Sequence, residues 1–275
     1  MKHFRFFSIT CIIFVLGIPA LWAQSSESSL NGMSLNGSTG LYSIPSGRIG
    51  WESSTNLGLD LGYHAIIRDG AASNIPRFNL SLFKLAEISG AFDFQPDGYF
   101  SPNKGTDFLG GLKIHLPLEK LTSTAIALGG NFQALNMENT GPYRYNAGQI
   151  YAAFTYAGQF FNMPAETTVV VGKTFREHQS DSNIDYGMGF DLLLFPKVFN
   201  RFAHWITDFS NFSYSVEAFG ADAWYRGVLN TGVRLDLSTI PGLGKFKFNI
   251  DLIVTDAFDD NRAFSVGAVF GLPVL

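Results

Sequence analysis

The sequence predicts an all-β protein: a single closed, antiparallel transmembrane β-barrel of about twelve strands, within a range of about ten to fourteen. Three observations predict this fold. Apolar residues alternate with polar or small residues over much of the chain, as they do in strands whose two faces meet different surroundings. Beyond the N-terminal end, no apolar run is long enough to cross a bilayer as a helix. Gly occurs 29 times, which suits tight turns and closely packed strands rather than a helical bundle.

Residues 1–23 resemble an export signal. A basic start is followed by an apolar stretch and by Ala20-Leu-Trp-Ala23, which precedes a polar, Ser-rich segment. We expect this signal to be cleaved, although Leu21 stands where a small residue is usual. The alternative is an uncleaved helical anchor.

The mature chain would have no cysteine, because Cys11, the one cysteine of the sequence, lies within the export signal. Disulfides and thiolate metal sites are therefore not expected. Removing Lys2 and Arg5 lowers the number of Lys and Arg from 19 to 17 against 23 Asp and Glu, a net charge of −6. Nucleic acid is not an expected partner, because the chain has no cluster of Lys and Arg to bind phosphates.

Residues 24–51, rich in Ser, Gly and Asn, are expected to form an N-terminal segment ahead of a barrel domain of residues 52–275. The first strand is expected at 56–67, where every odd position from Leu57 is apolar. The alternation recurs at residues 78–82, 86–94, 108–116, 126–134, 150–156, 167–173, 184–192, 212–218, 229–235, 246–254 and 264–272. Strands of about nine to eleven residues are what a tilted β-strand needs to cross a bilayer.

The connections between these strands alternate between two kinds. One kind is long and polar, at residues 95–106, 136–145, 176–183 and 256–262. The other kind carries Pro soon after an apolar residue, as at Pro117. An even number of strands returns both termini to the same side, as in bacterial outer-membrane barrels.

One connection is unusual in its length and pattern. Its apolar residues Val198, Phe199, Phe202, Trp205 and Ile206 fall at helical spacing. We therefore expect a short amphipathic helix near residues 197–208. It would lie at the membrane interface or cap the mouth of the barrel.

The strand faces opposite the apolar ones are polar and charged. Their ionisable residues are Asp60, His64, Glu87, Asp93, Lys113, His115, Asp185, Asp191, Glu217, Arg234, Asp236, Lys247 and Asp251, with Arg77 at a strand end. The apolar faces offer more surface than one small core needs, and such a surface would aggregate in water but is required in lipid. We therefore expect these residues to line a lumen and to be candidates for ion selectivity. Lone lumen histidines are more often hydrogen-bonded wall residues than ligands, so no metal site is expected.

The end of the chain resembles the recognition signal on the last strand of bacterial outer-membrane barrels. The resemblance is carried by Ser265, Gly267, Phe270 and Leu272, although residues 273–275 follow where that pattern ends in an aromatic. It implies that the protein lies in the cell outer membrane of a Gram-negative-type envelope. The implied partners are the barrel-assembly machinery and outer-membrane lipid.

A second resemblance precedes the first strand. Thr39, Gly40, Leu41, Pro45 and Ser46 look like the Thr-Gly-Leu-x-x-x-Pro-Ser/Thr motif of YjbH-like outer-membrane proteins. The resemblance implies a link to exopolysaccharide production, although members of that family are commonly much longer. The alternative is a tight turn that pins the N-terminal segment inside or beneath the barrel.

Three classes of function stay open. The first is a passive, porin-like channel for small hydrophilic solutes, whose acid-rich lumen would concentrate cations, unless paired acids and bases fill it. The second is a structural or surface-interaction barrel, or an accessory component of polysaccharide export. The third is a lipase-type outer-membrane enzyme. We expect no enzyme and no cofactor, because the sequence has no G-x-S-x-G motif and offers no clear Ser-His-acid set.

Overall fold

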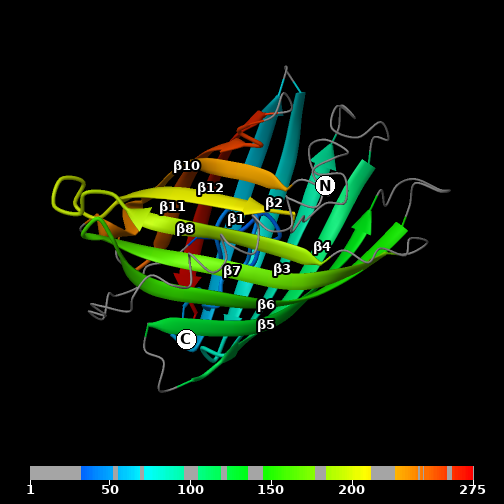
Figure 1. Ribbon diagram of the computed structural model, residues 1–275, viewed down its shortest axis with the longest axis horizontal. Helices are drawn as coiled ribbons and strands as arrows, with labels where there is room; N and C mark the ends of the chain where they lie inside the picture. Colours follow the sequence, from blue (N-terminus) through cyan, green and yellow to red (C-terminus); the bar gives the residue numbers. More distant parts are fainter. Residues whose placement is uncertain are drawn as a thin grey trace, which may run out of the picture.

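Twelve strands form one closed antiparallel barrel in the computed structural model (Figure 1). The structure describes residues 32–51, 55–68, 71–95, 105–118, 123–135, 145–176, 184–211, 227–240, 242–243, 245–258 and 262–274. The strands are β1 Leu57–Arg68, β2 Ala71–Leu82, β3 Ala86–Gln95, β4 Gly105–Leu116, β5 Thr124–Leu135, β6 Tyr145–Phe160, β7 Met163–Arg176, β8 Asp185–Leu193, β9 Ala203–Ser210, β10 Val228–Asp236, β11 Lys247–Thr255 and β12 Ala263–Pro273. Each strand pairs with the next, and β1 pairs with β12 to close the ring. The predicted fold class is confirmed.

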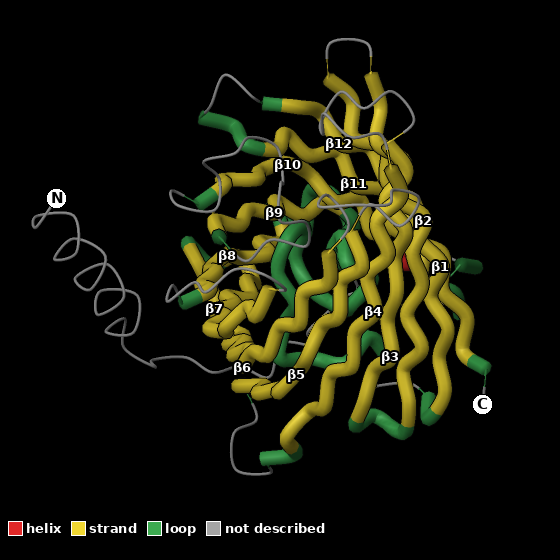
Figure 2. The backbone as a smooth tube through the Cα atoms, turned by 90° about the vertical axis from the view of Figure 1, so that its right-hand side faces the viewer, coloured by secondary structure: helices red, strands yellow, loops and turns green. Residues whose placement is uncertain are grey.

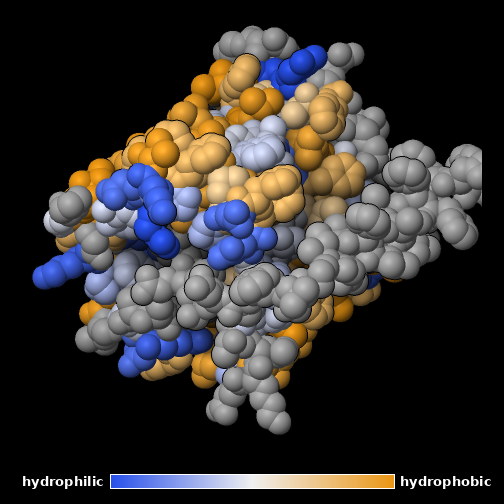
Figure 3. Space-filling model, turned by 60° about the vertical axis from the view of Figure 1, so that its left-hand side comes forward, coloured by the Kyte–Doolittle hydropathy of each residue, from blue (hydrophilic) through white to orange (hydrophobic). Residues whose placement is uncertain are grey.

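The two faces of each strand separate apolar from polar residues, as β1 illustrates. Leu61 and Tyr63 are exposed on the outside, whereas Asp60 and His64 are buried inside. Figure 3 shows hydrophobic side chains gathered over the outer face of the barrel on that side. A closed ring of strands also leaves no unpaired backbone edge, which is the condition for a sheet to lie in hydrocarbon.

The predicted helix near residues 197–208 is wrong. Residues 203–210 form β9, which pairs with β8 and β10, and the preceding residues make only turns. The spacing misled because Ile206 is apolar yet faces inward, where it packs in the buried core of the lumen. When both faces of a strand carry apolar residues, apolar and polar residues no longer alternate, and the spacing of the apolar residues can resemble that of an amphipathic helix.

The strand expected at 212–218 lies outside the described residues, as does Glu217. In the ring β9 lies between β8 and β10, and the barrel has the predicted twelve strands. Within the described ranges the one helical element is a 3-10 turn, Leu237–Thr239, capped by the side chain of Asp236. No helix of these ranges is long and apolar enough to cross a membrane.

The candidate functional site: a lumen occupied by residues 32–51

Residues 32–51, which we call the plug, lie inside the ring of strands (Figure 2). The plug folds back on itself through bridges that join Met33 to Thr39 and Gly40 to Pro45. Gly37 makes one of its turns with a φ of +90°. A Cβ there would fall 2.7 Å from the carbonyl oxygen of Phe78 on β2, so both the turn and the close approach to the wall require glycine.

An apolar cluster joins the plug to the wall. Its plug members are Leu35, Leu41, Tyr42 and Ile44. Its wall members are Ile66, Ile75, Ala91, Leu109, Tyr151, Ala153, Val170, Ile206, Ile253 and Ala263. Burial in this cluster raises the pKa of the Tyr42 hydroxyl above its ordinary value.

Glycines of the wall form sockets for plug side chains. A Cβ at Gly187 would fall 2.6 Å from Cγ2 of Ile44, and a Cβ at Gly189 would fall 2.6 Å from Cδ1 of Leu41. Larger residues at these positions of β8 would collide with the plug. The wall is therefore shaped to the segment that it surrounds.

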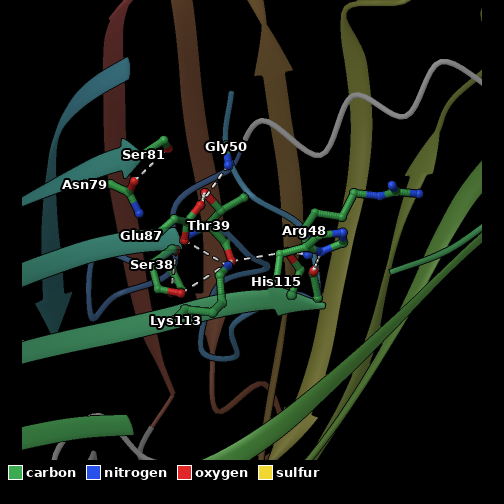
Figure 4. Close-up of polar contacts among 12 residues, drawn as sticks. Ser38, Thr39, Arg48, Gly50, Asn79, Ser81, Glu87, Lys113 and His115 are labelled. Atoms are coloured by element: carbon green, nitrogen blue, oxygen red, sulfur yellow. Dashed lines mark hydrogen bonds and ion pairs between the residues drawn. The ribbon is translucent and has the colours of Figure 1, made fainter. Parts of the chain in front are cut away.

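The ion pair of Glu87 and Lys113 binds the middle of the plug (Figure 4). The two residues oppose each other directly on β3 and β4, with Nζ 2.9 Å from Oε2. Glu87 accepts hydrogen bonds from the backbone N–H and hydroxyl of Thr39, and from the backbone N–H of Gly50 at 2.7 Å. Lys113 donates to the carbonyl of Thr39 at 3.0 Å.

Asp208 on β9 binds the turn of the plug at Tyr42 and Ser43. Its carboxylate accepts from the backbone N–H groups of Tyr42 and Ser43, at 2.9 and 2.8 Å, and from the Ser43 hydroxyl at 2.8 Å. The side-chain amide of Asn230 donates to the same carboxylate at 2.8 Å. The hydroxyls of Ser43 and Ser210 lie 3.0 Å apart.

Other wall side chains bind backbone groups of the plug. Arg77 donates to the carbonyls of Met33 and Ser34, both at 2.7 Å. Asn79 donates to the carbonyl of Gly37 at 3.1 Å. The hydroxyl of Thr155 accepts from the N–H of Gly47 at 2.9 Å, and a ring nitrogen of His115 lies 3.0 Å from the carbonyl of Gly47.

The plug ends at a charged pair near the start of the barrel. Lys247 on β11 contacts Asp60 on β1 at 2.6 Å, and the indole N–H of Trp51 donates to Asp60 at 2.7 Å. The pair crosses β12 at Gly271, where a Cβ would fall 2.1 Å from an oxygen of Asp60. Lys247 also lies 5.1 Å from the centre of the Trp51 ring, a cation–π distance.

A second buried pair joins β10 and β11. Arg234 donates to both carboxylate oxygens of Asp251, at 2.7 and 3.1 Å. His64 on β1 lies 3.4 Å from Asp251 and 2.7 Å from the hydroxyl of Ser265. His64 and Asp251 meet across Gly267 of β12, which lies opposite both in the strand register.

A network of amides and hydroxyls follows β5 to β8 around the wall. Asn131 donates to Gln149 at 2.9 Å, and Gln149 donates to Thr174 and Asp185, both at 3.0 Å. Asp185 also accepts from Thr174 at 2.5 Å. These partners of the Asp185 carboxylate are neutral.

The structure places the predicted lumen residues as follows. Asp60, His64, Glu87, Asp93, Lys113, Asp185, Asp191, Arg234, Asp236, Lys247 and Asp251 are buried, and His115 is half-buried. Of the terminal signal residues, Ser265 and Gly267 face inward, whereas Phe270 is exposed on the outer face and Leu272 is half-buried. The motif residues Thr39, Gly40, Leu41, Pro45 and Ser46 all lie in the plug.

The sequence analysis missed Asp208 and Glu166. Asp208 was the last residue of the expected helix, so its position on an inward strand face was hidden. Glu166 precedes the expected strand at 167–173, but β7 begins earlier, at Met163. It accepts from Arg48 of the plug at 2.9 Å.

The interior carries an excess of acid. Among the buried side chains of the described residues, eleven are Asp or Glu and four are Arg or Lys. These buried side chains therefore carry a net negative formal charge. The described ranges contain no group of three His, Cys, Asp or Glu able to hold a metal ion.

Three solved outer-membrane proteins are similar to this chain. The KdgM porin has a TM-score of 0.49 and 7% identity, covering 77% of this chain and 98% of its own. Omp33 of Acinetobacter baumannii has a TM-score of 0.43 and 10% identity, covering 80% of this chain and 98% of its own. OprD of Pseudomonas aeruginosa has a TM-score of 0.34 and 9% identity, covering 86% of this chain and 98% of its own.

No family model matches the chain, and no curated protein matches its sequence. The resemblance of residues 36–49 to YjbH-like proteins therefore has no support from a family match and stays a prediction.

Proposed function

We propose that the protein is a porin-like channel of the outer membrane that passes small hydrophilic solutes and prefers cations. The observation that carries the proposal is the closed barrel with an apolar outer face and a polar, acid-rich interior. An apolar outer face of this extent suits lipid, and a polar inner face suits water and dissolved solutes. The proposal includes export through the signal at residues 1–23 and insertion by the barrel-assembly machinery.

Asp185 is the side chain on which selectivity would depend most. Asp60, Glu87 and Asp251 each contact a Lys or Arg of the wall, which neutralises part of their charge. Asp185 contacts Gln149 and Thr174, so its negative charge stays available to a passing ion.

A second candidate function follows from the occupied lumen. A barrel whose interior is filled by its own chain could act without conducting, as a surface-interaction barrel or as an accessory component of polysaccharide export. The buried cluster around Leu41 and Ile44 favours this alternative, since its apolar side chains fill part of the lumen.

Conductance of the refolded mature chain, residues 24–275, in a planar bilayer distinguishes the two candidates. Under a KCl gradient we expect discrete openings and a reversal potential with the sign of a cation preference. Asp185→Asn should reduce this preference, and Asn131→Asp, which adds a carboxylate to the same network, should increase it. An inserted barrel that never conducts would exclude the channel and favour the second candidate.

A further inference from the structure

We infer that the plug is the gate of the proposed channel: it closes the lumen by occupying it and opens the lumen by leaving as a unit. The inference rests on the proposed function, because only a conducting barrel can have a gate. No disulfide can hold the plug in place, because residues 24–275 contain no cysteine. The question is therefore whether the contacts that hold the plug are of a kind that can be released.

The wall keeps most of its charge pairs when the plug leaves. Glu87–Lys113, Arg234–Asp251 and Asp60–Lys247 are pairs between wall strands, with closest distances of 2.9, 2.7 and 2.6 Å. Release of the plug therefore leaves none of these six charged groups without its ion-pair partner. An unpaired buried charge would be the largest cost of opening, and the wall avoids that cost at these positions.

The plug itself carries little charge. Arg48 is the one Lys, Arg, Asp or Glu among residues 32–51, and it binds Glu166 at 2.9 Å near the plug's end. The wall binds the rest largely through backbone N–H and carbonyl groups, as Asp208 and Arg77 do. Water can replace bonds of this kind in an open lumen.

The plug also has internal bonds that would keep it together outside the wall. The N–H of Leu35 donates to the carbonyl of Tyr42 at 2.9 Å, and the N–H of Leu41 donates to the carbonyl of Ile44 at 3.0 Å. Leaving the lumen exposes these four apolar side chains to water, so the closed state is the more stable one. Openings are therefore expected to be rare in the wild type.

A cross-link between Ser43→Cys and Ser210→Cys tests the gate directly. The two hydroxyl oxygens lie 3.0 Å apart, which brings the substituted thiols within reach of a disulfide. The mature chain, residues 24–275, has no other cysteine. The oxidised protein should show no openings in a planar bilayer, and a reductant added to the same membrane should restore openings at the frequency of the single Ser→Cys variants.

The single variants Ser43→Cys and Ser210→Cys are the matched controls, because neither can cross-link within one chain. Two further variants should loosen the plug by different means. Asp208→Asn weakens the bonds to the plug backbone, and Gly187→Ala fills the socket of Ile44. Asp208→Asn should raise the frequency of openings at least about tenfold, the effect of losing one charge-assisted hydrogen bond. Gly187→Ala should raise this frequency as well, because overpacking destabilises the closed state.

Two results would overturn the gate, and the first of them leaves the channel standing. If the oxidised and reduced cross-link variants conduct alike, the gate fails and the channel stands. The second result uses Leu41→Asp/Ile44→Asp, whose charges cannot stay buried in the lumen. If this variant conducts while wild type and both loosening variants stay silent, the plug is a fixed stopper. If it is also silent although inserted, the proposed function fails with the gate.

Discussion

Gly267→Ala should destabilise the barrel, because two buried side chains cross over this glycine. A Cβ at Gly267 would fall 2.2 to 2.4 Å from three ring atoms of His64. The ring has little freedom to move away. It is fully buried, its Nδ1 lies 2.7 Å from the Ser265 hydroxyl, and it packs edge-on against Tyr42 at 5.6 Å between ring centres.

The expected cost follows from these contacts. Overpacking of a buried site costs about 1–3 kcal/mol. Displacing His64 also breaks its hydrogen bond to Ser265, worth about 1 kcal/mol. We therefore expect Gly267→Ala to lower the free energy of unfolding by about 2–4 kcal/mol. Gly148→Ala on β6 is the matched control, since a Cβ there meets nothing within 4 Å, and its effect should stay within about 1 kcal/mol.

Urea unfolding from lipid vesicles, followed by tryptophan fluorescence, measures both variants. His64→Ala removes the ring with which the new methyl group collides, so Gly267→Ala should cost much less in the His64→Ala background. A coupling energy near zero between the two substitutions, or equal effects of Gly267→Ala and Gly148→Ala, would refute the steric explanation.

Three further predictions concern other contacts and use the same unfolding measurement. Asp251→Asn should lower the free energy of unfolding by about 3–5 kcal/mol, because it leaves Arg234 buried without its ion pair. Asp251→Leu combined with Arg234→Met should lower it far less, and equal effects would contradict this explanation. Leu128→Arg, on the outer face of β5, should cost about 2–4 kcal/mol in lipid, and Val198→Arg, in an exposed turn, about 0–1 kcal/mol; a reversed order would argue against lipid around β5. Gly37→Ala should cost at least about 1–2 kcal/mol, since its φ of +90° and the nearby backbone oppose a side chain; a neutral effect would show that this turn can rearrange.

The alternation of apolar and polar residues predicted the barrel because it is a local pattern, set within each strand by the different surroundings of its two faces. It failed at β9, where Ile206 faces a buried core rather than a polar lumen. The polar positions of the same alternation likewise predicted that Glu87 and Lys113 point inward, but they did not predict what these two residues bind. Their partner, Thr39, lies 48 positions from Glu87, and Asp208 lies 166 positions from Tyr42. Contacts at such separation follow from how the ring closes, which no local pattern records.

The plug could be anticipated only as one of two alternatives for residues 36–49. Its Ser-, Gly- and Asn-rich composition is that of a loose segment, whereas in the structure Leu41 and Ile44 are fully buried. Composition misled because the apolar residues of the plug are scattered among Ser, Gly and Asn and are buried largely against the wall.

The width of the barrel explains why the wall and the plug fit each other as they do. Eight-stranded barrels are filled by their own side chains and sixteen-stranded barrels hold open water, so a barrel of twelve strands lies between these sizes, and here residues 32–51 occupy its interior. Sockets at Gly187 and Gly189 would serve no purpose in a pore that is always open. Charge pairs that the wall completes by itself, such as Glu87–Lys113, stay paired whether or not that segment is in place. A lumen that is closed by a fitted segment and tolerates its departure needs both features.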